Sequence, residues 1–471
     1  MLFAFRRNEL SPPGVGLPRR ERTIAVTAIL INVAMANLDS AIANTALPTI
    51  ARDLQTTDAQ SIWVVSAYQI AMVATLLPAA ALGEVIGLRR VSMVALVLFT
   101  IASLVCGMAP TFQWLVAGRV LQGMSAAGIL GLSVAMMRSI YPRELMGAGM
   151  GLNALVVGMS FAAGPTAASI ILSFASWHWL FLINVPLGIL GIVMGLHSLP
   201  PTIRGGWRFD RLAALLCGVG LATTIFTLNA VTRGASWPLT IAGAVIAVAA
   251  ILALLRRQMG SPAPILPVDL LRRPVIALSA ISSYLTLNTQ ALAFISLPFM
   301  FQAVLGYSQV ETGFLITPWP VFVALTAPFA GRWSDKLPGS LIGSCGLVIL
   351  AIAMALLATL PAEPSALDIV WRMALCGVGF GLFQSPTMRI VIMASPAERS
   401  GGAGGVSSIV GNLGQATGAA LVAGLFNLFG SQGAIIALWI GSAFALIASG
   451  VSLMRLRHSL AGFFAAEVFR D

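Results

Sequence analysis

Residues 61–109 read SIWVVSAYQIAMVATLLPAAALGEVIGLRRVSMVALVLFTIASLVCGMA, two long apolar runs joined by one short polar stretch. Each run holds roughly 20 residues, and an α-helix of that length crosses a hydrocarbon core of about 30 Å. A helix also satisfies its own backbone hydrogen bonds, which lipid cannot do. The stretch therefore predicts two transmembrane helices joined by a tight loop.

The same pattern continues along the 471 residues, of which 58% are hydrophobic and only 9% charged. A water-soluble globule of this composition has nowhere to place its apolar surface, so its main solvent must be lipid. The sequence predicts an all-α integral membrane protein with fourteen transmembrane helices. The expected spans are roughly 24–45, 61–82, 91–109, 113–137, 147–173, 179–198, 211–231, 238–256, 275–302, 309–330, 340–360, 368–394, 403–429 and 432–454.

The net charge of +11 raises the possibility of nucleic-acid binding, which the positions of the 27 basic residues exclude. With the N-terminus in the cytoplasm, 22 of them face inside, Arg455 included. The other five are Arg52, Arg233 and Arg372 on the outer side and Arg119 and Arg389 within spans. This bias obeys the positive-inside rule, so we expect a multi-pass protein of a bacterial inner membrane with both termini cytoplasmic.

Cysteine spacing and the N-terminal residues exclude some further features. The four cysteines, Cys106, Cys217, Cys345 and Cys376, fall in expected spans without CxxC spacing, so we expect neither disulfides nor a metal site. Residues 1–22 contain no short apolar core with a cleavage site, so no removable signal peptide is expected.

The two halves of the chain echo each other in two inner loops. Leu82–Arg90 follows the second span and Gly331–Gly339 follows the tenth, and their acids Glu84 and Asp335 are 251 residues apart. Two six-helix bundles plus two inserted helices would place both loops at equivalent positions, an architecture typical of transporters. The predicted domains are a cytoplasmic tail at 1–22, a bundle at 23–200, an inserted helix pair with linkers at 201–273, a bundle at 274–455 and a cytoplasmic tail at 456–471.

Five further stretches resemble motifs of a known family. They are LDSAIANTALP at 38–48, RVLQG at 119–123, Gly164-Pro165, WHWLFLINVP at 177–186 and QAVLGYS at 302–308. Together with the inner loops they make the chain similar, over nearly its full length, to the fourteen-span drug:proton antiporters of the major facilitator superfamily, the EmrB/QacA type. Ala80, Glu84 and Ala168-Ser169 depart from the family pattern, which usually has Gly, Asp and Gly-Gly there.

Asp39 is the only one of the sixteen acids expected deep within a span. A charge there costs about 2.5–3.5 kcal/mol, so it needs a partner, a watery cavity or a proton. By helical rise, Asp39 and Arg119 both lie roughly 8–10 Å below the outer edge of the membrane. Burial favours the neutral carboxyl and the arginine favours the carboxylate, so this pair can carry the coupling proton. A permanent structural ion pair, with Gln122 as a packing amide, is the alternative.

The resemblance implies that the inner loops act as gates, through Glu84, Gly87, Arg89, Arg90, Gly331 and Asp335. A solvated turn with ordinary inner charges is the alternative. Gly158, Gly164 and Pro165 provide small residues and a kink in the fifth span, and the resemblance implies that they seal the path against proton leak. Simple helix packing would use the same residues.

Substrate contacts are harder to assign, because a cavity and a lipid-facing stripe look alike in sequence. The candidates are Tyr68, Gln69, Gln122, Asn288, Gln290, Trp319, Gln384, Arg389, Asn412 and Gln415, and bundle packing explains each of them equally well. Spans nine to fourteen contain no acid beyond Glu311 and Asp368 near outer ends, which favours hydrophobic neutral, monocationic or anionic cargo over dications.

Other mechanisms fit less well. Lys336 is the only lysine and lies in no G-x-x-x-x-G-K-[ST] motif, which excludes an ATP-driven pump. No H-E-x-x-H or G-x-S-x-G motif occurs, so an intramembrane enzyme is a remote alternative and no catalytic residue is expected. We expect proton-coupled efflux by a monomer with no cofactor; a passive facilitator or importer of a small metabolite stays open.

Overall fold

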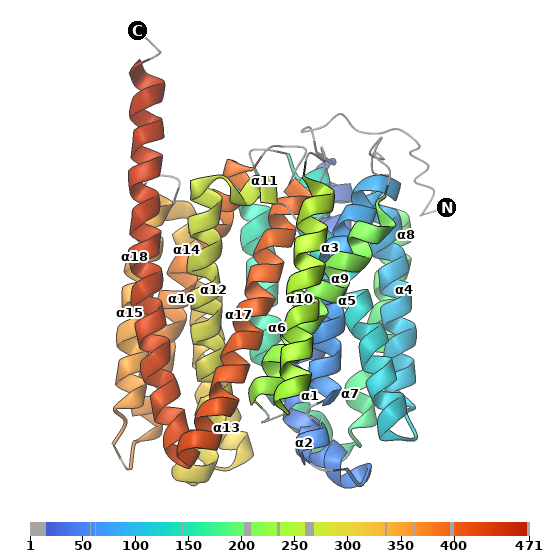
Figure 1. Ribbon diagram of the computed structural model, residues 1–471, viewed down its shortest axis with the longest axis vertical. Coiled ribbons are helices and arrows are strands. Elements are labelled where there is room, and N and C mark those ends of the chain that lie inside the picture. The colour runs from blue at the N-terminus through green and yellow to red at the C-terminus, as the bar shows by residue number, and fades with distance from the viewer. Residues whose placement is uncertain are drawn as a thin grey trace. The chain divides into compact units, whose positions relative to one another are not determined.

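The computed structural model describes residues 16–468, with gaps at 57, 62, 143–144, 202–208, 233–235, 260–267, 335–336, 362 and 396–399. Within these residues all regular structure is helical and no strand occurs. The long helices that Figure 1 shows are those expected of a chain that crosses lipid many times.

Thirteen helices of the described chain are long and apolar enough to span a membrane, and they match thirteen of the fourteen predicted spans. The remaining prediction, 147–173, corresponds to α6 (Met146–Phe174), a helix of 29 residues. The described apolar stretch within α6, Gly149–Ser160, is shorter than the other thirteen, so α6 is not counted among them. The predicted all-α membrane fold is confirmed.

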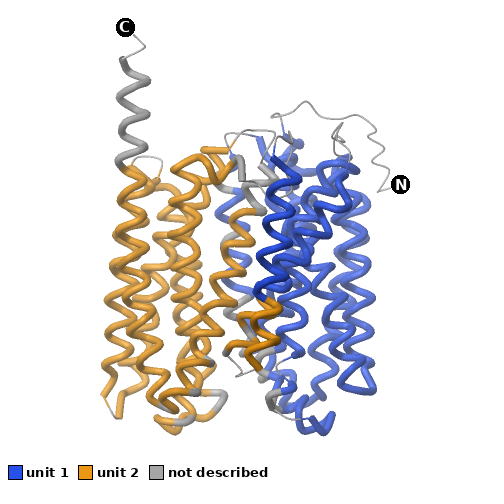
Figure 2. The backbone as a smooth tube through the Cα atoms, viewed as in Figure 1, with its two compact units in different colours: residues 1–224, 244–266, 400–405 blue, residues 225–243, 267–399, 406–471 orange. Residues whose placement is uncertain are grey.

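The chain forms two compact units, of which the first contains residues 1–224, 244–266 and 400–405 (Figure 2). Its complete helices are α1 (Arg19–Asp53), α2 (Asp58–Ser61), α3 (Trp63–Ile86), α4 (Leu88–Gly107), α5 (Phe112–Ile140), α6, α7 (His178–Leu182) and α8 (Asn184–Ser198). The helices α9 (Arg211–Thr232) and α10 (Trp237–Gln258) contribute residues to both units. The separate inserted pair at 201–273 therefore stays a prediction.

The second unit contains residues 225–243, 267–399 and 406–471. Its helices are α11 (Val268–Leu271), α12 (Pro274–Phe299), the π-helix η2 (Met300–Val304), α13 (Gln309–Ile316), α14 (Pro318–Trp333), α15 (Gly339–Ala358), α16 (Ala366–Ala394), α17 (Ser400–Phe429), the 3₁₀ turn η4 (Gly430–Gln432) and α18 (Gly433–Val468). Six residues at the start of α17 belong to the first unit. The predicted span 309–330 is two helices, because α13 ends before Pro318 begins α14.

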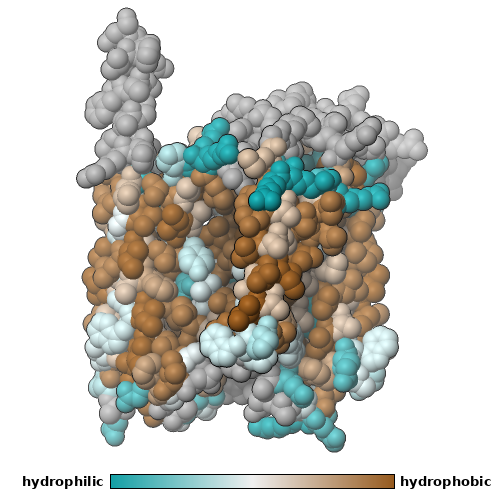
Figure 3. All heavy atoms as spheres, in the orientation of Figure 1, coloured by the Kyte–Doolittle hydropathy of each residue, from teal (hydrophilic) through white to brown (hydrophobic). Residues whose placement is uncertain are grey.

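Lipid exposure explains why so many large apolar side chains lie on the surface. Val94, Ile101, Val245 and Leu325 are more than half exposed or close to it. Figure 3 shows this apolar surface along the middle of the helices, with hydrophilic residues gathered near helix ends. In water such patches would drive association, whereas in a bilayer they face a solvent of matching polarity.

Glycines set the helix packing around Asp39 in the first unit. A Cβ added to Gly123 of α5 would lie 2.2 Å from the Tyr68 carbonyl oxygen of α3. A Cβ added to Gly164 of α6 would lie 2.4 Å from the Ala41 Cβ of α1. Only glycine permits these crossings, so α3 packs on α5, and α6 on α1, at backbone distance.

Candidate functional site

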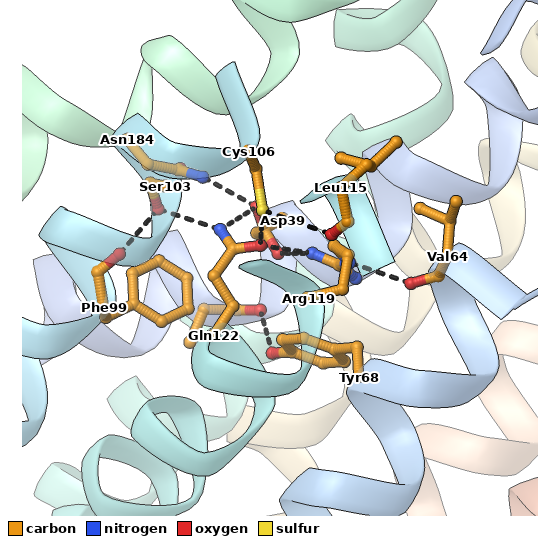
Figure 4. A network of polar contacts seen from close by, with 11 residues as sticks. Asp39, Val64, Tyr68, Phe99, Ser103, Cys106, Leu115, Arg119, Gln122 and Asn184 are labelled. Carbon is orange, nitrogen blue, oxygen red and sulfur yellow. Dashed lines mark hydrogen bonds and ion pairs between the residues drawn. The ribbon is translucent and has the colours of Figure 1, made fainter. Parts of the chain in front are cut away.

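Asp39 is the centre of a buried polar network in the first unit, and it is only 2% exposed (Figure 4). Its Oδ2 accepts a hydrogen bond from Arg119 Nη1 at 2.5 Å. Its Oδ1 accepts from Gln122 Nε2 at 3.1 Å and from Asn184 Nδ2 at 2.7 Å. An ionised carboxylate only accepts hydrogen bonds, so three donors fit the charged form of Asp39 in this conformation.

Arg119 is fully buried on α5 and is held by more than the carboxylate. Its Nε donates to the Val64 carbonyl at 2.9 Å, and Nη1 also donates to Gln122 Oε1 at 2.9 Å. Its guanidinium carbon lies 4.2 Å from the Tyr68 ring centre and 5.6 Å from that of Phe181. Among the described residues Nη2 has no hydrogen-bond partner, so one face of this cation is satisfied by aromatic rings alone.

Gln122 links the ion pair to α4. Its amide donates to Asp39 and to Ser103 Oγ at 2.8 Å, and its Oε1 accepts from Arg119 and faces Cys106 Sγ at 3.3 Å. Both polar atoms of the amide are therefore occupied. Gln122 thus forms hydrogen bonds with both members of the ion pair.

The charges of this network balance in only one protonation state of Asp39. With Asp39 ionised, the buried group of Asp39 and Arg119 is neutral overall. Protonation of Asp39 would leave Arg119 as a buried cation without a counter-charge, and uncompensated buried charges cost about 3–5 kcal/mol. That state favours another conformation or the entry of water.

The first inner loop contains a glycine that no other residue replaces without strain. Gly87 separates α3 from α4 with φ +108°, a region that L side chains rarely adopt. Arg89 is the second residue of α4, and its Nη2 donates to the Leu196 carbonyl of α8 at 2.6 Å. Glu84 is half-buried and Arg90 is exposed. The loop is thereby joined to the last turn of α8, where a cation is favourable.

The second inner loop is only partly described. Gly331 is half-buried near the end of α14, and Asp335 lies outside the described residues. Ser334 Oγ donates to the Gly331 carbonyl at 2.6 Å and accepts from Arg389 Nη1 at 2.9 Å. The guanidinium of Arg389, predicted as a substrate contact, thus lies beside this loop.

The predicted antiporter motif on α6 lies against α1. Gly164 packs on Ala41, two residues from Asp39, and Gly158 is half-buried. The side chain of Pro165 lies outside the described residues. Gly164 thus places α6 directly against α1 at this position, and the sealing role stays a prediction.

The structure separates the other cavity candidates into two groups. Tyr68, although fully buried, donates to the Ala36 carbonyl at 3.3 Å and faces Arg119, so it belongs to the Asp39 network. Asn288 and Trp319 are also buried, and within the described chain their Oδ1 and Nε1 have no hydrogen-bond partner. Half-buried candidates are Gln69, Gln290, Gln384, Asn412 and Gln415.

Sequence reasoning missed two residues. Asn184 donates directly to Asp39, and only its place in the stretch 177–186 drew attention to it. Arg455, counted as a cytoplasmic charge, is instead fully buried within the span Gly433–Leu456. It contacts Ser279, Thr387 and Ser452, and in the described residues it makes no ion pair. No cluster of metal-binding side chains occurs in the part of the chain that was described.

Comparison with known proteins gives consistent matches over most of the chain. A family model described as the Major Facilitator Superfamily matches residues 29–419 and 276–466. The chain is 45% identical over 443 residues to "Uncharacterized transporter YebQ" of Escherichia coli strain K12, which covers 94% of this chain and 97% of that protein.

Two more distant relatives have more specific names. "Putative multidrug resistance protein MdtD" of Escherichia coli O81 strain ED1a is 30% identical over 410 residues, covering 84% of this chain and 85% of that protein. "Riboflavin transporter RibZ" of Clostridioides difficile strain 630 is 27% identical over 409 residues, covering 86% and 89%. The crystal structure of the human organic anion transporter MFSD10 has a TM-score of 0.65 at 14% identity, covering 93% of this chain and 100% of that chain, a likeness of fold.

Proposed function

Because the chain belongs to the major facilitator superfamily, and is thus a multi-span membrane transporter, we propose that it exports small hydrophobic compounds in exchange for protons. It works by alternating access, as a member of the fourteen-span drug:proton antiporter group. The proton gradient supplies the energy, and the proposal needs no cofactor, metal or catalytic residue. A bacterial inner membrane, with both termini in the cytoplasm, is the proposed location.

The observation that carries the proposal is the buried pair of Asp39 and Arg119, with oxygen and nitrogen 2.5 Å apart and both side chains at most 1% exposed. A proton carrier must exist in two states of comparable free energy. Desolvation favours neutral Asp39, whereas three hydrogen bonds and Arg119 favour the carboxylate, so a modest change in packing moves the balance.

Transport follows from that balance. In one conformation Asp39 accepts a proton from the outer side, which releases Arg119; in the other it returns the proton to the cytoplasm and the pair closes again. Each charge that crosses the membrane supplies about 2.3 kcal/mol per 100 mV, enough to accumulate a substrate severalfold. The inner loops at Glu84–Arg90 and Gly331–Asp335 act as gates.

The proposed cargo is hydrophobic and neutral, monocationic or anionic. Support comes from the scarcity of acids in spans nine to fourteen and from the multidrug-resistance name of a relative with 30% identity. We propose a monomer as the working unit, because a single chain contains both of the six-helix bundles that a transporter of this architecture needs.

Inverted vesicles with an imposed pH gradient test the proposal. A fluorescent lipophilic cation and a fluorescent lipophilic anion are supplied in parallel, and the native chain is compared with Asp39→Asn. Gradient-driven movement that disappears in Asp39→Asn, at equal protein level in the membrane, supports antiport. Equal transport by both chains would reject the role of Asp39.

A second candidate is an importer or passive facilitator of a small metabolite. The relative named as a riboflavin transporter, which matches 86% of this chain, favours it. Counterflow of labelled riboflavin in vesicles without any gradient separates the two: exchange that ignores both the pH gradient and Asp39→Asn would favour the facilitator.

A further inference from the structure

α8 touches the two functional regions of the first unit with its two ends. At its first residue, Asn184 donates to Asp39 Oδ1 at 2.7 Å, and Asn184 is 1% exposed. Near its last residue, the Leu196 carbonyl accepts from Arg89 Nη2 of the inner loop at 2.6 Å. The two contacts are twelve residues apart, which is about 18 Å along a helix.

We propose that Asn184 is a positioning residue that transmits the protonation state of Asp39 through α8 to the inner loop at Arg89. This inference rests on the proposed function, because it takes Asp39 as the proton carrier. It assigns to one rigid helix the link between the proton site and the gate.

Among the described residues, the donors to Asp39 come from two helices. Arg119 and Gln122 both belong to α5 and are also tied to each other, at 2.9 Å. Asn184 is the donor from α8. A change in the hydrogen bond between Asp39 and Gln122 therefore acts on α5, which Arg119 and Gln122 already fix to α3 and α4. A change in the hydrogen bond between Asp39 and Asn184 acts on α8 instead.

The chemistry of the carboxylate directs the proton to the Asn184 side. Oδ2 faces the charged Arg119, and hydrogen bonds with a charged donor are about twice as strong as those with a neutral amide. Oδ1 faces the neutral amides of Gln122 and Asn184. A proton on Oδ1 takes one of the two lone pairs that accept from Gln122 Nε2 and Asn184 Nδ2, so these two amides compete for the remaining one and the hold of α8 on α1 weakens.

Groups that titrate or carry charge around Asp39 come from three helices. They are Arg119 of α5, Tyr68 of α3 and Cys106 of α4. In the described chain α8 contributes only the amide of Asn184 to Asp39, and α6 contributes the glycine contact at Ala41. Asn184 is thus the polar group through which α8 can sense the proton.

The packing of α8 lets it respond as a body. A Cβ on Gly188 would lie 2.1 Å from Thr100 Oγ1 of α4, and one on Gly191 would lie 2.2 Å from Asn32 Oδ1 of α1. The Thr100 and Asn32 side chains thus lie directly against the glycines of α8, so α8 is closely packed on α4 and α1. A close-packed helix transmits strain along its length instead of absorbing it locally.

Infrared titration and hydrogen exchange of the full chain in lipid nanodiscs test the proposal. The protonated carboxyl band assigned by its loss in Asp39→Asn is followed against pH. In Asn184→Ala the ionised form loses one donor, so the midpoint of this band should move up by about one pH unit. Asn37→Ala is the matched control, because this buried amide of α1 donates to its own backbone at Val33.

Amide exchange of the loop residues 84–90 gives the second readout. In the native chain the protection factor of these amides, which is corrected for the intrinsic pH dependence of exchange, should change severalfold across the same pH range. The change should vanish in Asp39→Asn and Asn184→Ala but persist in Asn37→Ala. An Asn184→Leu chain, close in shape and without a donor or a titrating group, repeats the test if the alanine chain does not fold. Loop exchange that still follows pH in both Asn184 variants, or an unmoved band, overturns the inference. Neither the carboxyl band nor the loop exchange depends on transport. A native chain that shows no proton-driven transport would therefore reject the proposed function without deciding the role of Asn184.

Discussion

Tyr68 and Trp319 occupy equivalent helix crossings in their own units. The Tyr68 carbonyl oxygen lies 2.2 Å from the Cβ position of Gly123, and the Trp319 carbonyl oxygen lies 2.2 Å from the Cβ position of Gly377. Both side chains are fully buried. The two residues are 251 positions apart, as are Glu84 and Asp335, so the repeat expected from the loops extends into the helices.

The two crossings carry different chemistry. In the first unit Arg119 lies over Tyr68 and binds Asp39. In the second unit the Trp319 ring packs against Phe294 at 5.2 Å and Phe380 at 6.4 Å between ring centres. The same framework thus holds an ion pair in one unit and an aromatic cluster in the other, which is why the proposal assigns proton coupling to the first unit.

Removal of Arg119 alone should destabilise the chain more than removal of both charges. In Arg119→Gln the buried Asp39 carboxylate loses its counter-charge, at a cost of about 3–5 kcal/mol in unfolding free energy unless it takes up a proton. In the double variant Asp39→Asn, Arg119→Gln no buried charge remains, so most stability returns. Thermal unfolding in detergent at pH 8 measures the difference. A double variant as unstable as Arg119→Gln would contradict this account.

The crossing of α6 and α1 should tolerate no methyl group at Gly164. In Gly164→Ala the new carbon would lie 2.4 Å from Ala41 Cβ, so the two helices must separate. Overpacking of this kind costs about 1–3 kcal/mol, and the shift reaches Asp39 two residues away. We expect transport to fall severalfold together with the melting temperature. Gly151→Ala on the same helix is the control, because nothing lies within 4 Å of its added carbon; equal losses in both would show that Gly164 has no special place.

The link between α9 and α10 should respond weakly to pH. Arg257 donates to Asp210 at 2.8 and 3.2 Å, and this contact holds the pKa of the Asp210 carboxyl below its ordinary value. A lowered pKa contributes stability above the ordinary value, and the contribution is lost as the pH falls through the lowered one. Both side chains are over a third exposed, so water screens the pair.

Arg257→Gln should therefore lower the unfolding free energy by less than about 1 kcal/mol at pH 7, and by less still as the pH falls toward the lowered pKa of Asp210. Melting temperatures of both chains from pH 7 to pH 3 provide the check. A difference that grows toward low pH would have the wrong sign for this pair.

Hydropathy alone predicted the helices because a chain in lipid must present about 20 apolar residues per crossing. Depth along two antiparallel spans brought Asp39 and Arg119 to the same level, and the structure joins them at 2.5 Å. Span ends were harder: Arg455 falls where the apolar run meets basic residues, and sequence cannot distinguish a snorkelling arginine from a buried one.

The hydrogen bonds from the two amides to Asp39 could not be predicted, for a different reason. Gln122 and Asn184 have the composition of ordinary packing residues, and only the crossing of α5 and α8 with α1 brings both onto one carboxylate oxygen. Helix rotation about its axis decides that contact, and the weak periodicity of an almost wholly apolar helix does not fix it. The sequence likewise does not fix which way Trp319 and Asn288 face, so both stay candidates for the substrate cavity.

Arg455 should stabilise the packing of α12, α16 and α18 to an extent that depends on its hydroxyl partners. Its Nη1 donates to Ser279 Oγ of α12 at 3.0 Å, and it also contacts Thr387 of α16 and Ser452 of α18. In Ser279→Ala the buried cation loses an acceptor, which should cost about 1–3 kcal/mol in unfolding free energy. In an Arg455→Met background no cation needs that acceptor, so the same substitution should be nearly neutral.

Ser282→Ala is the control, since this buried hydroxyl of α12 donates to its own backbone at Leu278. Melting curves of the four chains of the cycle give the coupling, and additive effects of Ser279→Ala and Arg455→Met would mean that the hydroxyl does not stabilise the cation.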